Sequence, residues 1–197
     1  MTEKRFYEKD SETETKSKNH RWRRSSKERG SLLEFLIILL VAFALVFGLV
    51  RPFIVEAFYI PSESMVPTLE IGDRVFVNKF IYRFAEPERG DIVVFESIEG
   101  SEQDLIKRVV AVPGDTVAVQ NGVLFVNGQP QEEPYVNDAF PDGSFFGPTT
   151  VPEDAVFVMG DNRGNSRDSR FFGPVPISNV EGEAFITFWP PSHVDLL

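Results

Sequence analysis

The sequence predicts a mainly β chain, in which a single N-terminal transmembrane helix precedes a domain of antiparallel β-sheet. Three observations support this class. An unbroken apolar run lies near the N-terminus, short β-branched and aromatic runs alternate with turn residues after it, and no convincing amphipathic helix follows residue 52. At 197 residues the chain has room for one good-sized domain with appendages.

Residues 1–30 form a polar segment that is rich in Ser, Lys, Glu and Arg and has no apolar period. Such a composition predicts a disordered tail. The segment carries ten basic and six acidic residues, whereas the remainder of the chain carries ten basic and 24 acidic residues. This asymmetry indicates two compartments. Because the acidic main domain would repel phosphate backbones, no nucleic-acid partner is expected.

The transmembrane helix is expected at residues 31–51. The apolar run from Leu32 to Val50 is about 28 Å long as a helix, close to the ~30 Å hydrocarbon core of a bilayer, and Glu34 is its only charge. The alternatives are a buried core helix and a cleavable signal peptide, the second with Val55-Glu56-Ala57 as a loose cleavage site. The length of the run, its apolar character all round and the Arg51-Pro52 pair favour a retained anchor.

A basic cluster between Lys16 and Arg29 precedes the expected anchor. By the positive-inside rule, the N-terminus is expected in the cytoplasm and the chain from about Pro52 onward outside it. The sequence thus predicts a single-pass protein of the cytoplasmic membrane, in contact with the lipid bilayer, whose main domain is extracytoplasmic.

Residues 52–197 are expected to form one β-rich domain. Asn121-Gly122 and Asn127-Gly128 are strong hairpin signals, because both central positions of a type I′ turn need a positive φ. Residues 129–151 are rich in proline and acidic residues and are expected to form a long surface excursion. The expected strands are Ile54–Ile60, Arg74–Asn78, Asp91–Glu96, Leu105–Val112, Thr116–Gln120, Val123–Val126, Ala155–Met159 and Ala184–Trp189.

The reactive side chains of the sequence are few. It has no cysteine and two histidines, His20 in the expected tail and His193 near the last residue. The lack of cysteine excludes disulfides, thiolate catalysis and cysteine-based metal sites, and no metal or cofactor is expected. A serine nucleophile needs a base within hydrogen-bond reach. With histidine poorly placed, lysine is the remaining side chain suited to that task.

Ser64 is the candidate nucleophile. It lies in a loop between Pro61 and Pro67, which forbid a regular helix or central strand across the segment. Ser62, two residues earlier, has a hydroxyl that could turn toward the same substrate atom. Taken alone, however, this loop is better explained as a turn rich in serine and proline.

Lys107 is the candidate base. In the expected strand it shares a face with Val109 and Ala111. Burial among apolar side chains would lower its pKa from about 10.4 toward neutrality and make it a usable base, whereas the usual alternative is a lysine that extends to solvent. Ser64 and Lys107 are 43 residues apart, so only tertiary folding can bring them together.

A dense polar segment, Gly160 to Arg170, lies between apolar segments. It includes Ser166 and Asp168. A surface loop can have this composition, but polar groups in such a position are often hydrogen-bonded scaffolding for a site.

Four segments in this order resemble the sequence boxes of the type I signal peptidases, membrane-anchored serine proteases that remove signal peptides from exported proteins. Each box alone is weak, but four in order behind a membrane anchor are highly specific, and the resemblance extends from the anchor to Phe188. Leu105 stands where some relatives have tyrosine. The boxes are Ser64-Met65-Val66-Pro67-Thr68-Leu69, Gly90-Asp-Ile-Val-Val-Phe95, Lys107-Arg108 with Val112-Pro113-Gly114-Asp115, and Gly160-Asp161-Asn162-Arg163 with Asn165-Ser166 and Asp168-Ser169-Arg170.

The resemblance implies that Ser64 is the nucleophile and that neutral Lys107 is its general base. Ser62 and the backbone N–H of Ser64 would form the oxyanion hole. Ser166 would hydrogen-bond to the lysine and orient it.

The resemblance further implies that Asp168 and Arg170 form a supporting ion pair. The substrate would bind as an added strand, with small pockets that select Ala-like residues. The residues expected to bind it are Ile60, Pro61, Asp104, Leu105 and Ile106.

The implied protein is a membrane-bound serine endopeptidase that cleaves signal peptides at small-x-small sites of exported preproteins, close to the protein export machinery. The alternative is a non-catalytic, signal-peptidase-like envelope or pilus assembly factor, which would be expected to lack the serine or the lysine. A self-cleaving repressor also uses a Ser–Lys pair, but the anchor and the absence of a helical DNA-binding region argue against it.

Overall fold

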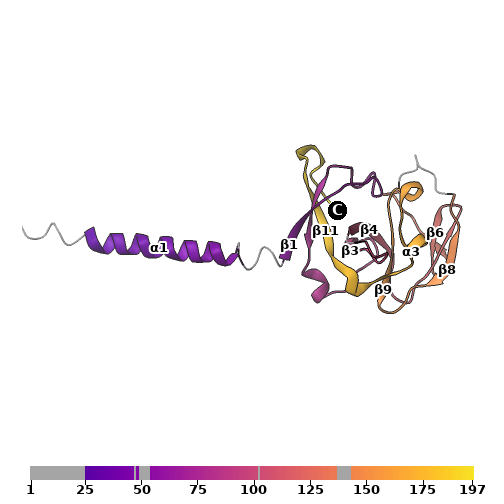
Figure 1. The fold of residues 1–197 in the computed structure, drawn as a ribbon, viewed down its shortest axis with the longest axis horizontal. Coiled ribbons are helices and arrows are strands. Elements are labelled where there is room, and N and C mark those ends of the chain that lie inside the picture. Colours follow the sequence, from indigo (N-terminus) through magenta and orange to yellow (C-terminus); the bar gives the residue numbers. More distant parts are fainter. Residues whose placement is uncertain (1–24, 47, 49–53, 102, 137–142) are drawn as a thin grey trace, which may run out of the picture. The chain divides into compact units, whose positions relative to one another are not determined.

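The computed structural model of the chain describes residues 25–46, 48, 54–101, 103–136 and 143–197. Two compact units are present, residues 1–49 and residues 50–197. The first contains the long helix α1, and the second contains all of the strands (Figure 1).

Helix α1 spans Ser25–Leu45, and every side chain described between Leu32 and Val46 is exposed. The helix begins at Ser25, within the segment that the sequence analysis expects to be a tail. Lys, Glu and Arg, which occur in residues 25–30, are good helix formers. The rest of the expected tail and residues 47 and 49–51 of the expected anchor lie outside the described residues. Within the described part of the chain, no helix combines the length and the apolar content that crossing a membrane requires.

The larger sheet of the second unit has its strands in the order β1-β2-β11-β3-β4-β9-β10, with β12 beside β11. All of these neighbours are antiparallel. The strands are β1 (Val55–Tyr59), β2 (Arg74–Asn78), β3 (Ile92–Glu96), β4 (Asp104–Ala111), β9 (Ala155–Met159), β10 (Val175–Pro176), β11 (Val180–Trp189) and β12 (Asp195–Leu196).

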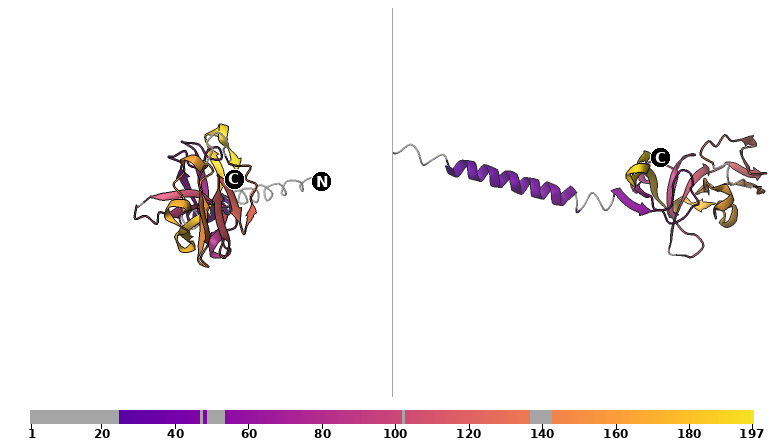
Figure 2. Two further views of the ribbon diagram at one scale, coloured as in Figure 1. Left: turned by 90° about the vertical axis from the view of Figure 1, so that its right-hand side faces the viewer. Right: turned by 90° about the horizontal axis from the view of Figure 1, so that it is seen from above.

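The smaller sheet has the order β7-β6-β5-β8 and is also antiparallel. Figure 1 shows β6 and β8 on the side of the domain away from β1, and the view from above in Figure 2 places the same strands at one end of the domain. The strands are β5 (Thr116–Gln120), β6 (Val123–Val126), β7 (Gln129–Pro130) and β8 (Phe146–Thr150).

Short helices connect the strands. Asp168 caps the first turn of α3 by accepting a hydrogen bond from the backbone N–H of Arg170 at 3.3 Å. The helices are α3 (Ser169–Phe172) and the 3₁₀ turns η2 (Ile81–Arg83), η3 (Arg163–Asn165), η4 (Ile177–Asn179) and η5 (Pro191–His193).

The predicted antiparallel β fold of the main domain is confirmed. Both Asn-Gly turns connect strands, and Asn121 and Asn127 have the expected positive φ values of 50° and 54°. The prediction that residues 129–151 form a surface excursion is wrong in part, because β7 and β8 lie in this stretch and belong to the smaller sheet. Proline at the sheet edge is tolerated where its missing N–H is not needed, so a high proline content did not exclude strands there.

Apolar side chains pack in two places that matter for the candidate site. One cluster lies between the two sheets and includes Val110, Ala111, Val117 and Phe157. Since Ala111 packs there beside Val110, after a register shift in β4, the prediction that it shares a face with Lys107 is wrong. The second cluster includes Met65 and Leu69 from the Ser64 loop, together with Ile60, Val75, Val77, Ile92, Val94, Ile106 and Ala184.

Candidate active site

Ser64 lies in the connection between β1 and β2, on a loop that the core holds in place. The side chains of Met65 and Leu69 are fully buried on either side of one turn, closed by a 2.9 Å hydrogen bond from Leu69 N–H to Met65 C=O. At the two ends of the loop, Ile60 N–H donates to Asp73 C=O at 2.9 Å and Gly72 N–H donates to Ile60 C=O at 3.0 Å. The Ser64 side chain is therefore presented from a fixed backbone.

Lys107 reaches Ser64 from β4. Its Nζ lies 2.7 Å from Ser64 Oγ and 2.7 Å from the backbone oxygen of Ile106. Both residues are buried, with 3% of Lys107 and 8% of Ser64 exposed. The residue types that the sequence placed 43 positions apart thus meet at hydrogen-bond distance in the folded chain.

The environment of Lys107 favours its neutral form. Burial lowers the pKa of Lys107 from 10.5 to about 8, while the negative charges of Asp168 and Asp161 oppose the shift. A neutral amine beside a hydroxyl is able to accept its proton, which a permanently charged lysine is not. This arrangement can activate a serine at mildly alkaline pH.

Ser62 is exposed and lies beside the pair, with its Oγ 3.4 Å from Ser64 Oγ. The backbone N–H of Ser64 takes part in none of the backbone hydrogen bonds of the described turns and loops. Two donors therefore lie near the hydroxyl of Ser64, as an oxyanion site requires.

Ser166 differs from expectation. Its Oγ is buried without a hydrogen-bond partner, so the predicted bond to Lys107 is not formed in this structure. Instead Ser166 packs against Gly160. A Cβ placed on Gly160 would lie 2.3 Å from Ser166 Oγ and 2.4 Å from the backbone oxygen of Ser64. The Gly160 backbone is therefore pressed directly against the residue that carries the candidate nucleophile.

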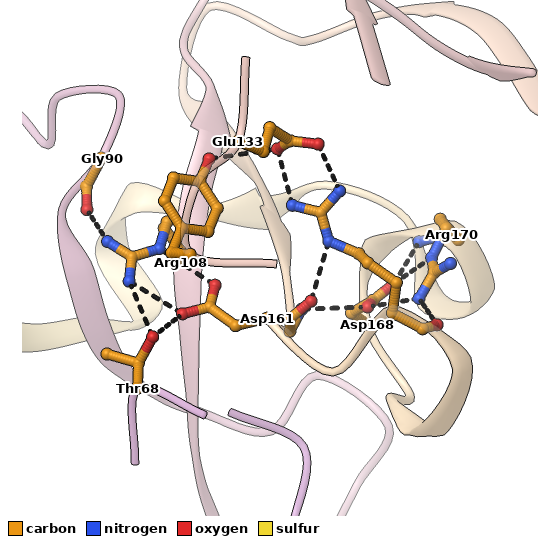
Figure 3. A network of polar contacts seen from close by, with 10 residues as sticks. Thr68, Gly90, Arg108, Glu133, Asp161, Asp168 and Arg170 are labelled. Atoms are coloured by element: carbon orange, nitrogen blue, oxygen red, sulfur yellow. Dashed lines mark hydrogen bonds and ion pairs between the residues drawn. The ribbon is translucent and has the colours of Figure 1, made fainter. Parts of the chain in front are cut away.

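The expected ion pair between Asp168 and Arg170 is present at 2.8 Å and is buried (Figure 3). Asp168 also accepts a 3.1 Å hydrogen bond from Gly160 N–H, and Arg170 donates to the Arg163 backbone oxygen at 2.8 Å. The pair thus fixes both ends of the turn that begins at Gly160.

A second buried ion pair joins Arg108, next to Lys107 on β4, to Asp161. Arg108 Nε and Nη2 donate to the two carboxylate oxygens at 3.0 and 2.8 Å, and Nη1 donates to the Gly90 backbone oxygen at 2.8 Å. Thr68 Oγ1, from the Ser64 loop, donates to the same carboxylate at 2.5 Å. Asp161 therefore connects three of the four sequence boxes (Figure 3).

Two residues that the sequence analysis did not single out also belong to this network. Glu133 accepts two hydrogen bonds from Arg163, and Tyr135 lies under the guanidinium of Arg108. Both come from residues 131–136, between β7 and β8, in the stretch expected to be a surface excursion. Nothing in the local pattern around them indicates a long-range partner.

The expected substrate-binding strand has an open side. Strand β4 pairs with β3 from Asp104 onward, but it pairs with β9 only from Arg108. Among the described residues, no strand pairs with Asp104, Leu105 or Ile106 on that second side. An edge of this kind is able to accept an extended peptide.

The other expected substrate-binding residues are Ile60 and Pro61, and only part of this segment is available to a substrate. Ile60 is buried, and its backbone N–H and C=O are already bonded to Asp73 and Gly72. Pro61 and Ser62 are exposed and remain beside Ser64. Within the described residues, no group of three His, Cys, Asp or Glu is placed to hold a metal ion.

Comparison with known proteins gives consistent matches. Residues 32–189 match the family described as Signal peptidase, peptidase S26. The chain is 47% identical over 152 residues to a signal peptidase I of Leptolyngbya laminosa, covering 74% of each chain. It is 42% identical over 180 residues to a probable signal peptidase I-2 of Synechocystis, covering 89% of this chain and 81% of the relative. A signal peptidase I of Enterococcus faecalis has a crystal structure that is 35% identical, with a TM-score of 0.44, covering 50% of this chain and 97% of that one.

Proposed function

Given that the chain belongs to the signal peptidase family, peptidase S26, and is a serine endopeptidase that cleaves signal peptides, we propose that Ser64 and Lys107 form its catalytic dyad. The observation that carries the proposal is the 2.7 Å distance between Lys107 Nζ and Ser64 Oγ in a buried site that lowers the lysine pKa to about 8.

In the proposed reaction, neutral Lys107 takes the proton of Ser64 while Oγ attacks the carbonyl carbon of the scissile bond. The oxyanion that develops accepts hydrogen bonds from Ser62 Oγ and the Ser64 backbone N–H. Lys107, now charged, gives its proton to the amine of the departing mature protein. Water then attacks the acyl-enzyme, and Lys107 acts again as the base.

The substrate is a preprotein that carries a signal peptide, and we infer that it binds as an extended strand. The open side of Asp104, Leu105 and Ile106 supports this mode. Main-chain hydrogen bonds would supply affinity, and shallow pockets would select small side chains before the cut. Such recognition suits substrates whose sequences share little beyond small residues at two positions.

We also propose that residues 31–51 anchor the chain in the cytoplasmic membrane and that the protease domain, residues 52–197, lies outside the cytoplasm. The apolar side chains of α1 and the basic residues before them support this topology. The lipid bilayer and the export machinery are the partners that this location implies.

The alternative, a non-catalytic assembly factor with the same fold, has no need of a buried lysine beside a serine. The deciding experiment is cleavage of a preprotein that ends its signal in Ala-x-Ala by the purified, detergent-solubilised chain. Ser64→Ala and Lys107→Met should each abolish cleavage, while Ser178→Ala, which changes an exposed serine, should retain it. Cleavage at the wild-type rate by Ser64→Ala would refute the dyad.

A further inference from the structure

We propose that Glu133 and Tyr135, in the connection between β7 and β8, are positioning residues for the reaction of Ser64 and Lys107. Neither touches the reacting atoms. Each instead holds a buried arginine of the site, Glu133 holding Arg163 and Tyr135 holding Arg108. This inference rests on the proposed function and adds to it a role for the connection between β7 and β8.

Glu133 acts through Arg163. The Arg163 guanidinium donates to the two Glu133 carboxylate oxygens at 2.7 and 2.6 Å, and its Nε donates to the Gly160 backbone oxygen at 2.9 Å. The side chains are nearly inaccessible, with 1% of Arg163 and 9% of Glu133 exposed. A bidentate pair of this kind fixes both the position and the plane of the guanidinium. The Gly160 carbonyl is therefore held at a set distance from Glu133.

Gly160 transmits that position to Ser64. The space beside its Cα is so small that an added Cβ would meet the Ser64 backbone oxygen at 2.4 Å. Two residues later, Asn162 N–H donates to the same Ser64 oxygen at 3.1 Å. A shift of the turn that begins at Gly160 must therefore shift Ser64 relative to Lys107.

Tyr135 acts through Arg108. The Arg108 guanidinium carbon lies 4.0 Å from the centre of the Tyr135 ring, within the range of a cation–π contact, while its nitrogens hold Asp161. Tyr135 Oη donates to Glu133 Oε1 at 3.0 Å, which couples the two positioning residues to each other. Because Arg108 follows Lys107 directly on β4, both members of the dyad are held from the same short segment, the connection between β7 and β8.

The charges of the network support the inference independently. The three buried ion pairs are Arg108 with Asp161, Arg163 with Glu133, and Arg170 with Asp168. Each pair joins one cation to one anion, so the pairs balance by themselves and place no net charge beside Lys107. Burial by itself would lower the pKa of Arg163, but its hydrogen bonds to Glu133 keep that pKa above the ordinary value. Removal of the Glu133 charge would leave a buried, unpaired cation in the site.

The test compares Glu133→Gln with Glu132→Gln in the purified full-length protein. Glu132 is the adjacent carboxylate and is exposed, so its variant is the matched control. We expect Glu133→Gln to lower kcat by about tenfold to a hundredfold, as a displacement of about 1 Å does, with KM changed much less. We also expect the acid limb of its kcat/KM profile to move to lower pH, because an unpaired Arg163 charge makes protonation of Lys107 less favourable. Glu132→Gln should match the wild type in kcat, in KM and in the position of the acid limb.

A purely structural role would give a different result. The melting temperature and the folded fraction would fall, but kcat per folded molecule and the position of the acid limb would not change, and this outcome would overturn the proposal. Tyr135→Phe removes only the hydroxyl that bonds Glu133 and serves if Glu133→Gln fails to fold. It should lower kcat in the same direction by a smaller factor, and a wild-type kcat would also overturn the proposal. If Ser64→Ala is inactive while both variants behave as wild type, the dyad stands and only the positioning role fails.

Discussion

The variant Lys107→Met distinguishes a neutral catalytic lysine from a charged structural one, because the two predict different effects of pH on the stability of the variant relative to the wild type. Methionine roughly keeps the volume of the side chain and removes the amine. The pKa of Lys107 falls from 10.5 to about 8 on folding. Since one unit corresponds to about 1.4 kcal/mol, the wild-type chain loses roughly 3 kcal/mol of folding free energy by burying this group.

The sign of the effect follows from the direction of the shift. A lysine whose folded pKa is depressed binds its proton more tightly in the unfolded state, so it penalises folding fully at pH values below about 8. The penalty decreases as the pH rises and vanishes above the unfolded value of 10.5. Lys107→Met does not carry this penalty at any pH. It does lose two hydrogen bonds, to Ser64 Oγ and to the Ile106 backbone oxygen, worth about 1 kcal/mol each.

At pH 7 the two effects nearly cancel or favour the variant, so Lys107→Met should be inactive yet about as stable as the wild type. At pH 10 the penalty on the wild type is mostly gone, and the variant should be less stable relative to it by about 2 kcal/mol more than at pH 7. Urea unfolding of both proteins at the two pH values measures this difference. The contributions of the titratable groups that both proteins share cancel in the comparison. A variant that is several kcal/mol less stable at pH 7, with no further change at pH 10, would show that Lys107 is a charged structural partner.

Three further predictions concern the turn behind the dyad and the membrane topology. Gly160→Ala should lose most activity and at least about 3 kcal/mol of stability in chemical unfolding, because its Cβ would meet the Ser64 backbone oxygen at 2.4 Å. A variant as stable as the wild type would contradict this packing. Ser166→Ala removes a buried hydroxyl that has no hydrogen-bond partner, so the variant should fold as well as the wild type. A lower cleavage rate with an altered pH profile would support a role of Ser166 in tuning Lys107. Unchanged kinetics would remove Ser166 from the site. Protease added to intact spheroplasts should degrade the domain after Pro52 and spare the N-terminal tail, and protection of the domain would reverse the proposed topology.

The sequence predicts the local part of the fold well. Asn121-Gly122 and Asn127-Gly128 force their turns through backbone geometry, and Ala155–Met159 forms a strand with the predicted bounds. β11 begins four residues before its predicted start at Ala184, and β10 and β12 have two residues each, which is too short for a periodic signal. Strand existence is thus predictable where residue type and period agree, and strand ends depend on the neighbouring strands.

The candidate site also has residues that sequence motifs indicate and residues that only the folded structure reveals. Ser64 and Lys107 were found through the resemblance of their boxes, since no spacing along the chain predicts a 2.7 Å contact. Glu133 and Tyr135 have no motif of their own, and their partners lie in other boxes. The missing bond between Ser166 and Lys107 could not be foreseen either, because a hydroxyl orientation depends on packing around Gly160. Tertiary contacts decide these features, and a linear pattern does not encode them.

The place of β11 in the larger sheet has a consequence for the timing of assembly. This strand lies between β2 and β3, although it is made long after both. Ser64 precedes β2, and Lys107 lies on β4, the neighbour of β3, so within the sheet the two halves of the dyad are joined through β11. A chain that lacks residues 180–189 has both reactive side chains but lacks the strand that joins β2 to β3. Because β11 is synthesised after the other long strands of this sheet, we expect the two halves of the sheet to be joined only once residues 180–189 have been made.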